Sequence, residues 1–90
     1  MRTEIPKNPE LEEVTYQALV ELGGTGTVKE IDQKVLEILD LDPRVAGELQ
    51  KGYTEKTKLE YKVAWCRTRL KQAGRITNIR NGVWSIIDQK

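Results

Sequence analysis

The sequence predicts an α+β fold that is mainly helical, with three main helices and a C-terminal two-stranded β-hairpin. Three segments carry apolar residues at helical spacing, and residues that favour helix ends flank each of them. An Asn-Gly pair near the C-terminus, between two short apolar runs, is typical of a tight hairpin turn. Ninety residues suffice for one small domain, which we expect to span residues 1–90.

The first helix is expected over residues 8–23. Asn8 is a candidate N-cap, Pro9 suits the first helical position, and the acidic residues that follow complement the positive helix end. Its apolar residues recur at helical spacing: Leu11, Val14, Ala18 and Leu22. Gly23 and Gly24 would end this helix.

The second helix is expected over residues 27–40. Thr27 with Glu30 three residues later has the pattern of a capping box. One apolar face would contain Ile31, Val35, Ile38 and Leu39. Pro43 would end or redirect the chain, and residues 25–27, just before the helix, can pair as a short third strand.

The third main helix is expected over residues 57–73, after an irregular segment, 44–56, with a short helical turn. Thr57 and Glu60 form a second capping-box pattern, and Gly74 would end the helix. A buried stripe with alternating spacings of four and three contains Leu59, Val63, Cys66, Leu70 and Ala73. This is the longest periodic segment of the chain.

The hairpin is expected over residues 75–87, with Asn81-Gly82 as a type I′ turn. That turn would pair Ile79 with Trp84 and Thr77 with Ile86 on one face. This mostly apolar face would pack on the helices. The other face would contain Asn78, Arg80, Val83 and Ser85. Trp84 and Trp65 are both expected in the core, because a chain without Phe needs other large residues there.

Charge is unevenly distributed along the chain, although the formal net charge is only +1. Residues 1–50 carry five basic and eleven acidic residues, whereas residues 51–80 carry nine basic and two acidic residues. This division indicates one acidic face and one basic face. A basic stretch of this size is typical of a protein that binds the phosphate backbone of nucleic acid.

The basic segment coincides with the third helix and the hairpin. Three helices followed by a hairpin form the winged helix-turn-helix arrangement, in which the third helix enters the major groove. The hairpin, or wing, then lies along the backbone or minor groove. Charge and topology therefore both predict binding of double-stranded DNA through one surface.

The candidate DNA-binding residues are polar, basic or aromatic side chains on these two elements. They are Lys56, Lys58, Tyr61, Lys62, Arg69, Arg75, Asn78, Arg80 and Asn81. The alternative for the cations is an ordinary solvated helix surface. Asn81 is explained by turn geometry alone, and Tyr61 either touches a sugar-phosphate edge or buries its ring.

Several other classes of function are excluded or disfavoured by the composition. With one cysteine and no histidine, the chain cannot build a zinc site or a Cys/His nucleophile pair. Cys66 is expected to be a small core residue, and paired carboxylates such as Glu12-Glu13 are explained by helix ends. We therefore expect no enzyme activity within these residues and no cofactor. Without a signal peptide or membrane span, and with one cysteine, a cytoplasmic location is expected.

The stretch from Leu41 to Ile87 resembles the amino-terminal domain of the restriction system protein Mrr. The resemblance rests on "YKVAWCRTRLKQAGRI" followed by "GVWSII". The matching positions are Tyr61, Val63, Trp65, Leu70, Ala73, Gly74, Ile76, Gly82, Trp84 and Ile86. The sequence departs from the family at Lys62, where Arg is usual, at Cys66, where a small residue is usual, and at Arg75, which replaces an apolar residue.

The resemblance implies a DNA-reading module of a modification-dependent restriction enzyme, which binds double-stranded DNA and can be sensitive to methylated bases. A nuclease domain, with the family's acidic residues and lysine, would then lie in a longer chain. Two alternatives remain: a stand-alone transcriptional regulator, and a winged helix that uses its basic surface to bind an acidic protein. The sequence leaves the oligomeric state open.

Overall fold

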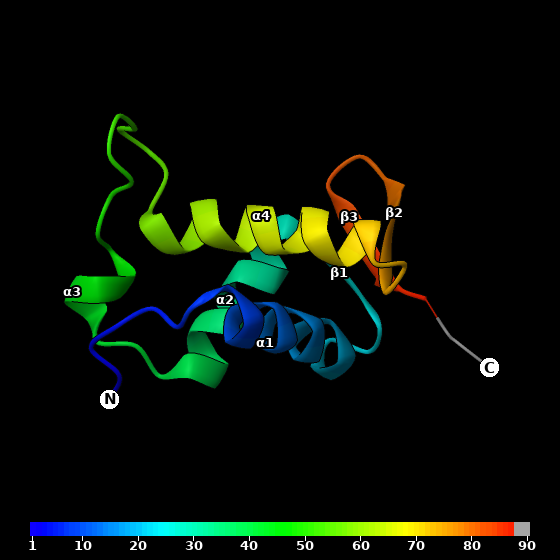
Figure 1. Cartoon of the computed structure of the whole chain (residues 1–90), viewed down its shortest axis with the longest axis horizontal. Coiled ribbons are helices and arrows are strands. Elements are labelled where there is room, and N and C mark those ends of the chain that lie inside the picture. The colour runs from blue at the N-terminus through cyan, green and yellow to red at the C-terminus, as the bar shows by residue number, and fades with distance from the viewer. Residues whose placement is uncertain (88–90) are drawn as a thin grey trace.

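A computed structural model describes residues 1–87 of the chain (Figure 1). In chain order the elements are α1 (Asn8–Glu21), β1 (Thr25–Thr27), α2 (Val28–Leu39), α3 (Pro43–Ala46), α4 (Lys58–Gln72), β2 (Ile76–Arg80) and β3 (Val83–Ile86). The predicted fold class is confirmed: the structure is mainly helical, with three longer helices and a β-hairpin in a winged-helix-like order. The short helical turn predicted before the third main helix is α3.

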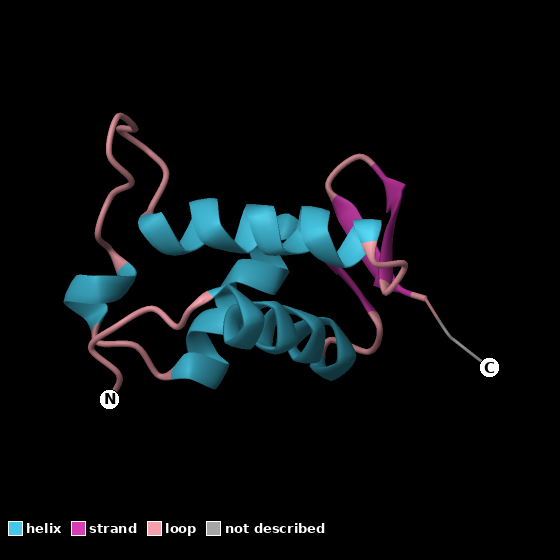
Figure 2. Cartoon of the chain, viewed as in Figure 1, coloured by secondary structure: helices cyan, strands magenta, loops and turns pink. Residues whose placement is uncertain are grey.

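The three strands form one antiparallel sheet in the order β1-β3-β2, beside the C-terminal end of α4 (Figure 2). The short strand expected over residues 25–27 is present, and it pairs with β3 through Thr25 opposite Ser85 and Thr27 opposite Val83. The amide of Val28, at the start of α2, donates to the carbonyl of Gly82 in the hairpin turn. The second helix is thereby tied to the hairpin.

The register predicted for the hairpin, with Ile79 opposite Trp84 and Thr77 opposite Ile86, is wrong. Arg80 lies opposite Val83, but Asn78 then lies opposite Trp84 and Ile76 opposite Ile86. The register shifts between Asn78 and Arg80, so that Ile79 is an extra residue on β2, as in a β-bulge. An extra residue moves every side chain before it to the other face.

The bulge changes which residues pack on the helices. Ile76 is fully buried, whereas the side chain of Ile79, which was expected on the core face, is 53% exposed. Asn78 shares the face of Trp84 rather than that of Arg80. Trp84 itself is half-buried against the core, as predicted.

The hairpin turn is not of type I′, which requires a positive φ at both central residues. Gly82 has a φ of +77°, but among the described residues Asp40 is the one non-glycine residue with a positive φ. Asn81 therefore has an ordinary backbone conformation. The side-chain amide of Asn78 donates to the carbonyls of Arg80 and Val83, at 3.1 and 2.9 Å, and so holds the two strands together at the turn.

Both predicted capping boxes are present. Thr27 and Glu30 exchange side-chain and backbone hydrogen bonds at the start of α2, and Thr57 and Glu60 do so at the start of α4. The cap predicted for α1 is wrong, because its N-cap is Lys7 and Asn8 is already helical. Proline is tolerated throughout the first helical turn, where amides lack intrahelical partners, so the helix can begin one residue before Pro9.

The core lies between α1, α2 and α4 and extends to β2. Its largest fully buried side chains are Leu11, Leu19, Ile31, Val35, Leu59, Val63, Leu70 and Ile76. The stripe predicted on α4 is buried from Leu59 to Leu70, but Ala73 is exposed because α4 ends at Gln72. Thr15 is also fully buried, and its hydroxyl donates to the carbonyl of Leu11. No helix within residues 1–87 is long and apolar enough to cross a membrane.

Candidate nucleic-acid interface

The predicted contact residues lie on α4, on the segment that precedes it, and on the hairpin. In Figure 1 the loop over residues 47–57 and the β2–β3 turn both extend beyond α4 on the same side. One side of α4 packs on α1 and α2, so its opposite, outer side faces the solvent. This outer side lies between the two projections (Figure 1). We call the outer side of α4, together with the 47–57 loop and the β2–β3 turn, the α4 face.

Three of the predicted cations are already paired with carboxylates. Lys58 pairs with Glu48 at 2.6 Å, and Nε of Arg69 donates to Glu12 at 2.8 Å. Arg75 donates to Glu13, and its guanidinium lies 4.1 Å from the centroid of the Tyr16 ring. The hydrogen bond to Glu13 raises the pKa of the Arg75 guanidinium.

These pairs change the expected separation of charge. Glu12 and Glu13 belong to the acidic half of the sequence, but α1 packs along α4 and brings their carboxylates to the basic residues. The acidic and basic halves of the chain are therefore partly interleaved in space. Sequence counting could not detect this, because it depends on which side of α1 faces α4.

Three other predicted cations form no ion pair with any residue that the structure describes. They are Lys56, Lys62 and Arg80, and all three are exposed. The ammonium group of Lys56 lies 6.0 Å from the centroid of the Tyr53 ring. Arg80 lies opposite Val83, so it occupies the sheet face away from Trp84, as the sequence predicted. These cations are distributed from one end of the α4 face to the other.

Of the two predicted asparagines, Asn81 is exposed in the turn. The amide of Asn78 is engaged inside the hairpin, as described above. Asn78 therefore has a structural role that its sequence position did not indicate.

Arg67, which adds to the basic count, belongs to the interior of the structure. It is 8% exposed, and its guanidinium lies 3.5 Å from the Asp32 carboxylate on α2 and 5.7 Å from the centroid of the Trp84 ring. Burial raises the pKa of Asp32 to about 6 and lowers the pKa of Arg67, and the attraction between them opposes both effects. This pair connects α2, α4 and β3 and is not available to a ligand.

The core position predicted for Trp65 is wrong. Its side chain is 57% exposed, because it lies on the side of α4 opposite the buried stripe. Its ring meets the half-buried Tyr61 edge to face, with centroids 6.4 Å apart, and Tyr61 in turn lies 5.8 Å from Tyr53. We call Tyr53, Tyr61 and Trp65 the aromatic cluster.

The sequence contained part of the signal for this cluster. Tyr61 and Trp65 are four residues apart, on one side of a helix and off its buried stripe. The approach of Tyr53 depends on the path of the 47–57 loop, which no local pattern specifies. Two of the three residues could therefore have been found from spacing.

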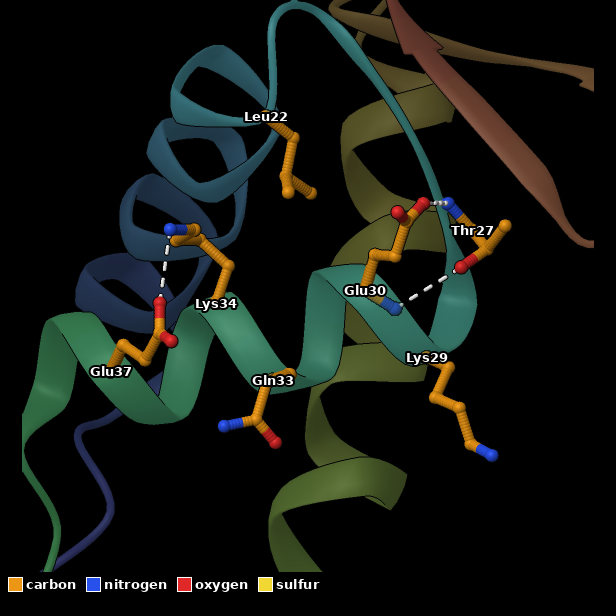
Figure 3. Close-up of a pocket in the computed structure, with 7 residues that line it drawn as sticks. All are labelled: Leu22, Thr27, Lys29, Glu30, Gln33, Lys34 and Glu37. Atoms are coloured by element: carbon orange, nitrogen blue, oxygen red, sulfur yellow. Dashed lines mark hydrogen bonds and ion pairs between the residues drawn. The ribbon is translucent and has the colours of Figure 1, made fainter.

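A hollow of about 560 Å³ lies on the outer side of α2, away from the α4 face (Figure 3). Its polar groups are largely engaged with one another: Lys34 pairs with Glu37 at 2.9 Å, and Glu30 completes the capping box with Thr27. Figure 3 shows Lys29 directed away from these pairs. The hollow therefore presents no convergent set of unsatisfied polar groups.

Metal and thiol chemistry find no support in residues 1–87. The described chain contains no group of three or more potential metal-ligating side chains. Cys66 is buried, and burial raises the pKa of its thiol to about 11. A thiol with this pKa is protonated at neutral pH and is a poor nucleophile, which agrees with its predicted role as a small core residue.

Comparison with protein-family models matches residues 11–89 to the Mrr N-terminal domain. Comparison with curated proteins finds no match, and neither does comparison with solved structures. The match to the family model covers α1 from Leu11 onward, all of α2 and α4, and the hairpin, and it includes the whole α4 face. The chain therefore belongs to the Mrr N-terminal domain family of restriction-system proteins.

Proposed function

We propose that this chain is a double-stranded DNA-binding module, with the outer side of α4 in the major groove and the β2–β3 hairpin along the flanking backbone. The observation that supports it best is the distribution of unpaired cations over the α4 face. Lys62 and Arg80 are exposed cations on two different elements of this face, α4 and the hairpin. Phosphates spaced along a duplex attract cations arranged in this way.

The candidate contacts fall into two groups in this proposal. Lys56, Lys62 and Arg80 can bind phosphate without breaking an ion pair to any residue within 1–87. Lys58, Arg69 and Arg75 must exchange a carboxylate for a phosphate, so each contributes less net affinity. Tyr61 and Asn81 add contacts from α4 and the turn, and Asn78 acts through the shape of the hairpin.

Family membership supports a role as the specificity module of an Mrr-like restriction protein, in which a nuclease domain would lie elsewhere in a longer chain. It also supports comparing methylated with unmethylated duplexes. A stand-alone regulator would bind the same duplexes but would be expected to dimerise.

The test is fluorescence anisotropy with labelled duplexes, methylated and unmethylated, over a range of salt concentrations. Log affinity should fall linearly with log salt, and Lys62→Ala or Arg80→Ala should each reduce the slope by about 1. The double variant Lys62→Glu/Arg80→Glu should lose binding and keep its thermal unfolding transition. Lys34→Ala, on the outer side of α2, is the matched control.

Absence of duplex binding at low salt would refute the proposal. Duplex binding that survives the double charge reversal would move the site away from the α4 face. Binding of an acidic protein or peptide in place of DNA would favour the alternative in which the basic surface contacts a protein.

A further inference from the structure

The aromatic cluster lies on the surface of the protein, and folding alone does not explain its exposure. The side chain of Tyr53 is 49% exposed and that of Trp65 is 57% exposed, and the Tyr61 ring meets Trp65 at 88°. Two rings at right angles present one ring face beside one ring edge. A planar group can therefore stack on one ring while the other borders it.

The 47–57 loop is held in place against α4. The amide of Gln50 donates to the Lys56 carbonyl and that of Tyr53 donates to the Gln50 carbonyl, while the backbone amide of Lys58 donates to the backbone carbonyl of Glu48. These bonds close the loop on itself and fasten it to the first turn of α4. Tyr53 is thus positioned against Tyr61 before any ligand binds, which lowers the entropic cost of binding.

Two hollows share the Tyr61–Trp65 pair. One, of about 250 Å³, is lined by Tyr53, Lys56, Tyr61, Ala64, Trp65 and Thr68. The other, of about 240 Å³, is lined by Asn8, Gln50, Tyr61, Lys62 and Trp65. Each is smaller than a typical site for a drug-sized molecule, so a single planar ring system is the appropriate size of ligand.

The charge of the residues that line the two hollows favours a ligand that carries negative charge. Each hollow has one lysine, Lys56 or Lys62, and among the described residues that line them there is no carboxylate. Neither lysine has an ion-pair partner within residues 1–87. Exposed aromatic rings beside unpaired cations are the combination with which proteins bind single-stranded nucleic acid, through base stacking and phosphate contact.

We propose that the aromatic cluster binds unpaired nucleobases of DNA, with bases stacked on Trp65 and Tyr61 and their phosphates at Lys56 and Lys62. The inference rests on the proposed function, since it uses the same α4 face, and it adds a class of substrate. DNA with a single-stranded segment or an extruded base would bind more tightly than fully paired DNA. A paired base cannot stack on these rings without leaving the duplex.

The test uses the full chain and an oligothymidylate of about ten nucleotides, a length within the range that single-stranded sites occupy. Titration of the Trp84→Phe variant, in which Trp65 is the sole tryptophan, should quench its fluorescence. Trp65→Leu should weaken binding about tenfold or more, whereas Trp65→Phe, which keeps an aromatic face, should retain most of the affinity. A duplex with one unpaired base should bind more tightly than the same duplex fully paired.

An oligothymidylate that leaves Trp65 fluorescence unchanged, or that binds Trp65→Leu as tightly as wild type, would overturn the inference. Equal affinity for an acidic peptide such as oligoglutamate would assign the cluster to a protein partner instead. If duplex binding depends on Lys62 and Arg80 but oligothymidylate does not bind, the proposed function stands and this inference fails. If oligothymidylate binds through Trp65 and no duplex binds, the proposed function fails.

Discussion

The guanidinium of Arg69 on α4 donates to the carboxylate of Glu12 on α1 at 2.8 Å, and Arg69 belongs to the α4 face that we propose for DNA. The Arg69 side chain is 56% exposed and that of Glu12 is 21% exposed. The pair lies partly in solvent, where ion pairs contribute little stability. Its larger effect is on charge, because it cancels one of the cations of the α4 face.

Glu12→Gln should therefore raise the affinity for duplex DNA. The change removes a negative charge near the phosphates and releases Arg69 to contact them, and exposed pairs of this kind are worth up to about 1 kcal/mol, or about fivefold. Anisotropy at low salt measures the gain, with Glu4→Gln, at an exposed position near the N-terminus, as the control. A loss of affinity would mean instead that Glu12 holds Arg69 in its binding position.

Asn78→Ala should loosen the hairpin. Its amide donates to the carbonyls of Arg80 and Val83, and the loss of both bonds at an exposed position should cost about 1 kcal/mol of the free energy of unfolding. Asn78→Asp should cost at least as much, because a carboxylate cannot donate to either carbonyl. Urea denaturation measures both. If stability is unchanged and DNA binding is lost, Asn78 contacts DNA and does not stabilise the hairpin.

The parts of the fold that local chemistry determines were predictable from the sequence. A capping box needs only a threonine and a glutamate three residues apart, and those at Thr27 and Thr57 are both present. The buried stripe of α4 follows from helical periodicity. The register of the hairpin could not be predicted from local sequence. It depends on the bulge at Ile79, which is determined by how β2 packs against the helices.

The candidate site was less predictable, because it also depends on how distant elements pack together. The sequence placed a cluster of cations on α4 and the hairpin, but their net charge depends on which carboxylates reach them. Glu12 and Glu13 are more than fifty residues from Arg69 and Arg75 in sequence, and only the packing of α1 on α4 brings them together. Trp65 was placed in the core on composition, although its helical position already opposed that placement.

Gly82 and Asn81 should differ sharply in their tolerance of alanine. Gly82 has a φ of +77°, where an L side chain is strained, and a Cβ there would meet no heavy atom of the described residues within 4 Å. Gly82→Ala should thus cost about 1 kcal/mol through backbone conformation alone. Asn81→Ala should change the free energy of unfolding by less than about 0.5 kcal/mol. Equal costs, measured by thermal denaturation, would indicate a type I′ turn after all.

Arg67→Ala should destabilise the fold by about 3 kcal/mol, because it leaves the mostly buried Asp32 carboxylate without its cation. The double variant Arg67→Met/Asp32→Leu should recover much of that loss, since apolar side chains of similar size remove the need for compensation. Urea denaturation of the single and double variants checks this. A double variant no more stable than Arg67→Ala would show that the contact of Arg67 with Trp84 matters more than its charge.

The raised pKa of Asp32 predicts a dependence of stability on pH that Asp32→Asn should remove. Burial raises the pKa of this carboxyl to about 6 in the folded chain, against an ordinary value of 3.8. Between these values the folded state binds more protons than the unfolded state, so the contribution of Asp32 to stability is complete below about pH 4 and is lost as pH rises through about 6.

The direct measurement is the difference in the free energy of unfolding between wild type and Asp32→Asn, from pH 4 to pH 8. That difference should fall by at most about 3 kcal/mol and then level off above about pH 7. The difference is needed because Glu10 and Asp42 have lowered pKa values, and their contributions to stability are lost toward acid pH, in the opposite direction. A difference that does not vary with pH would mean that Arg67 offsets the burial of Asp32 completely.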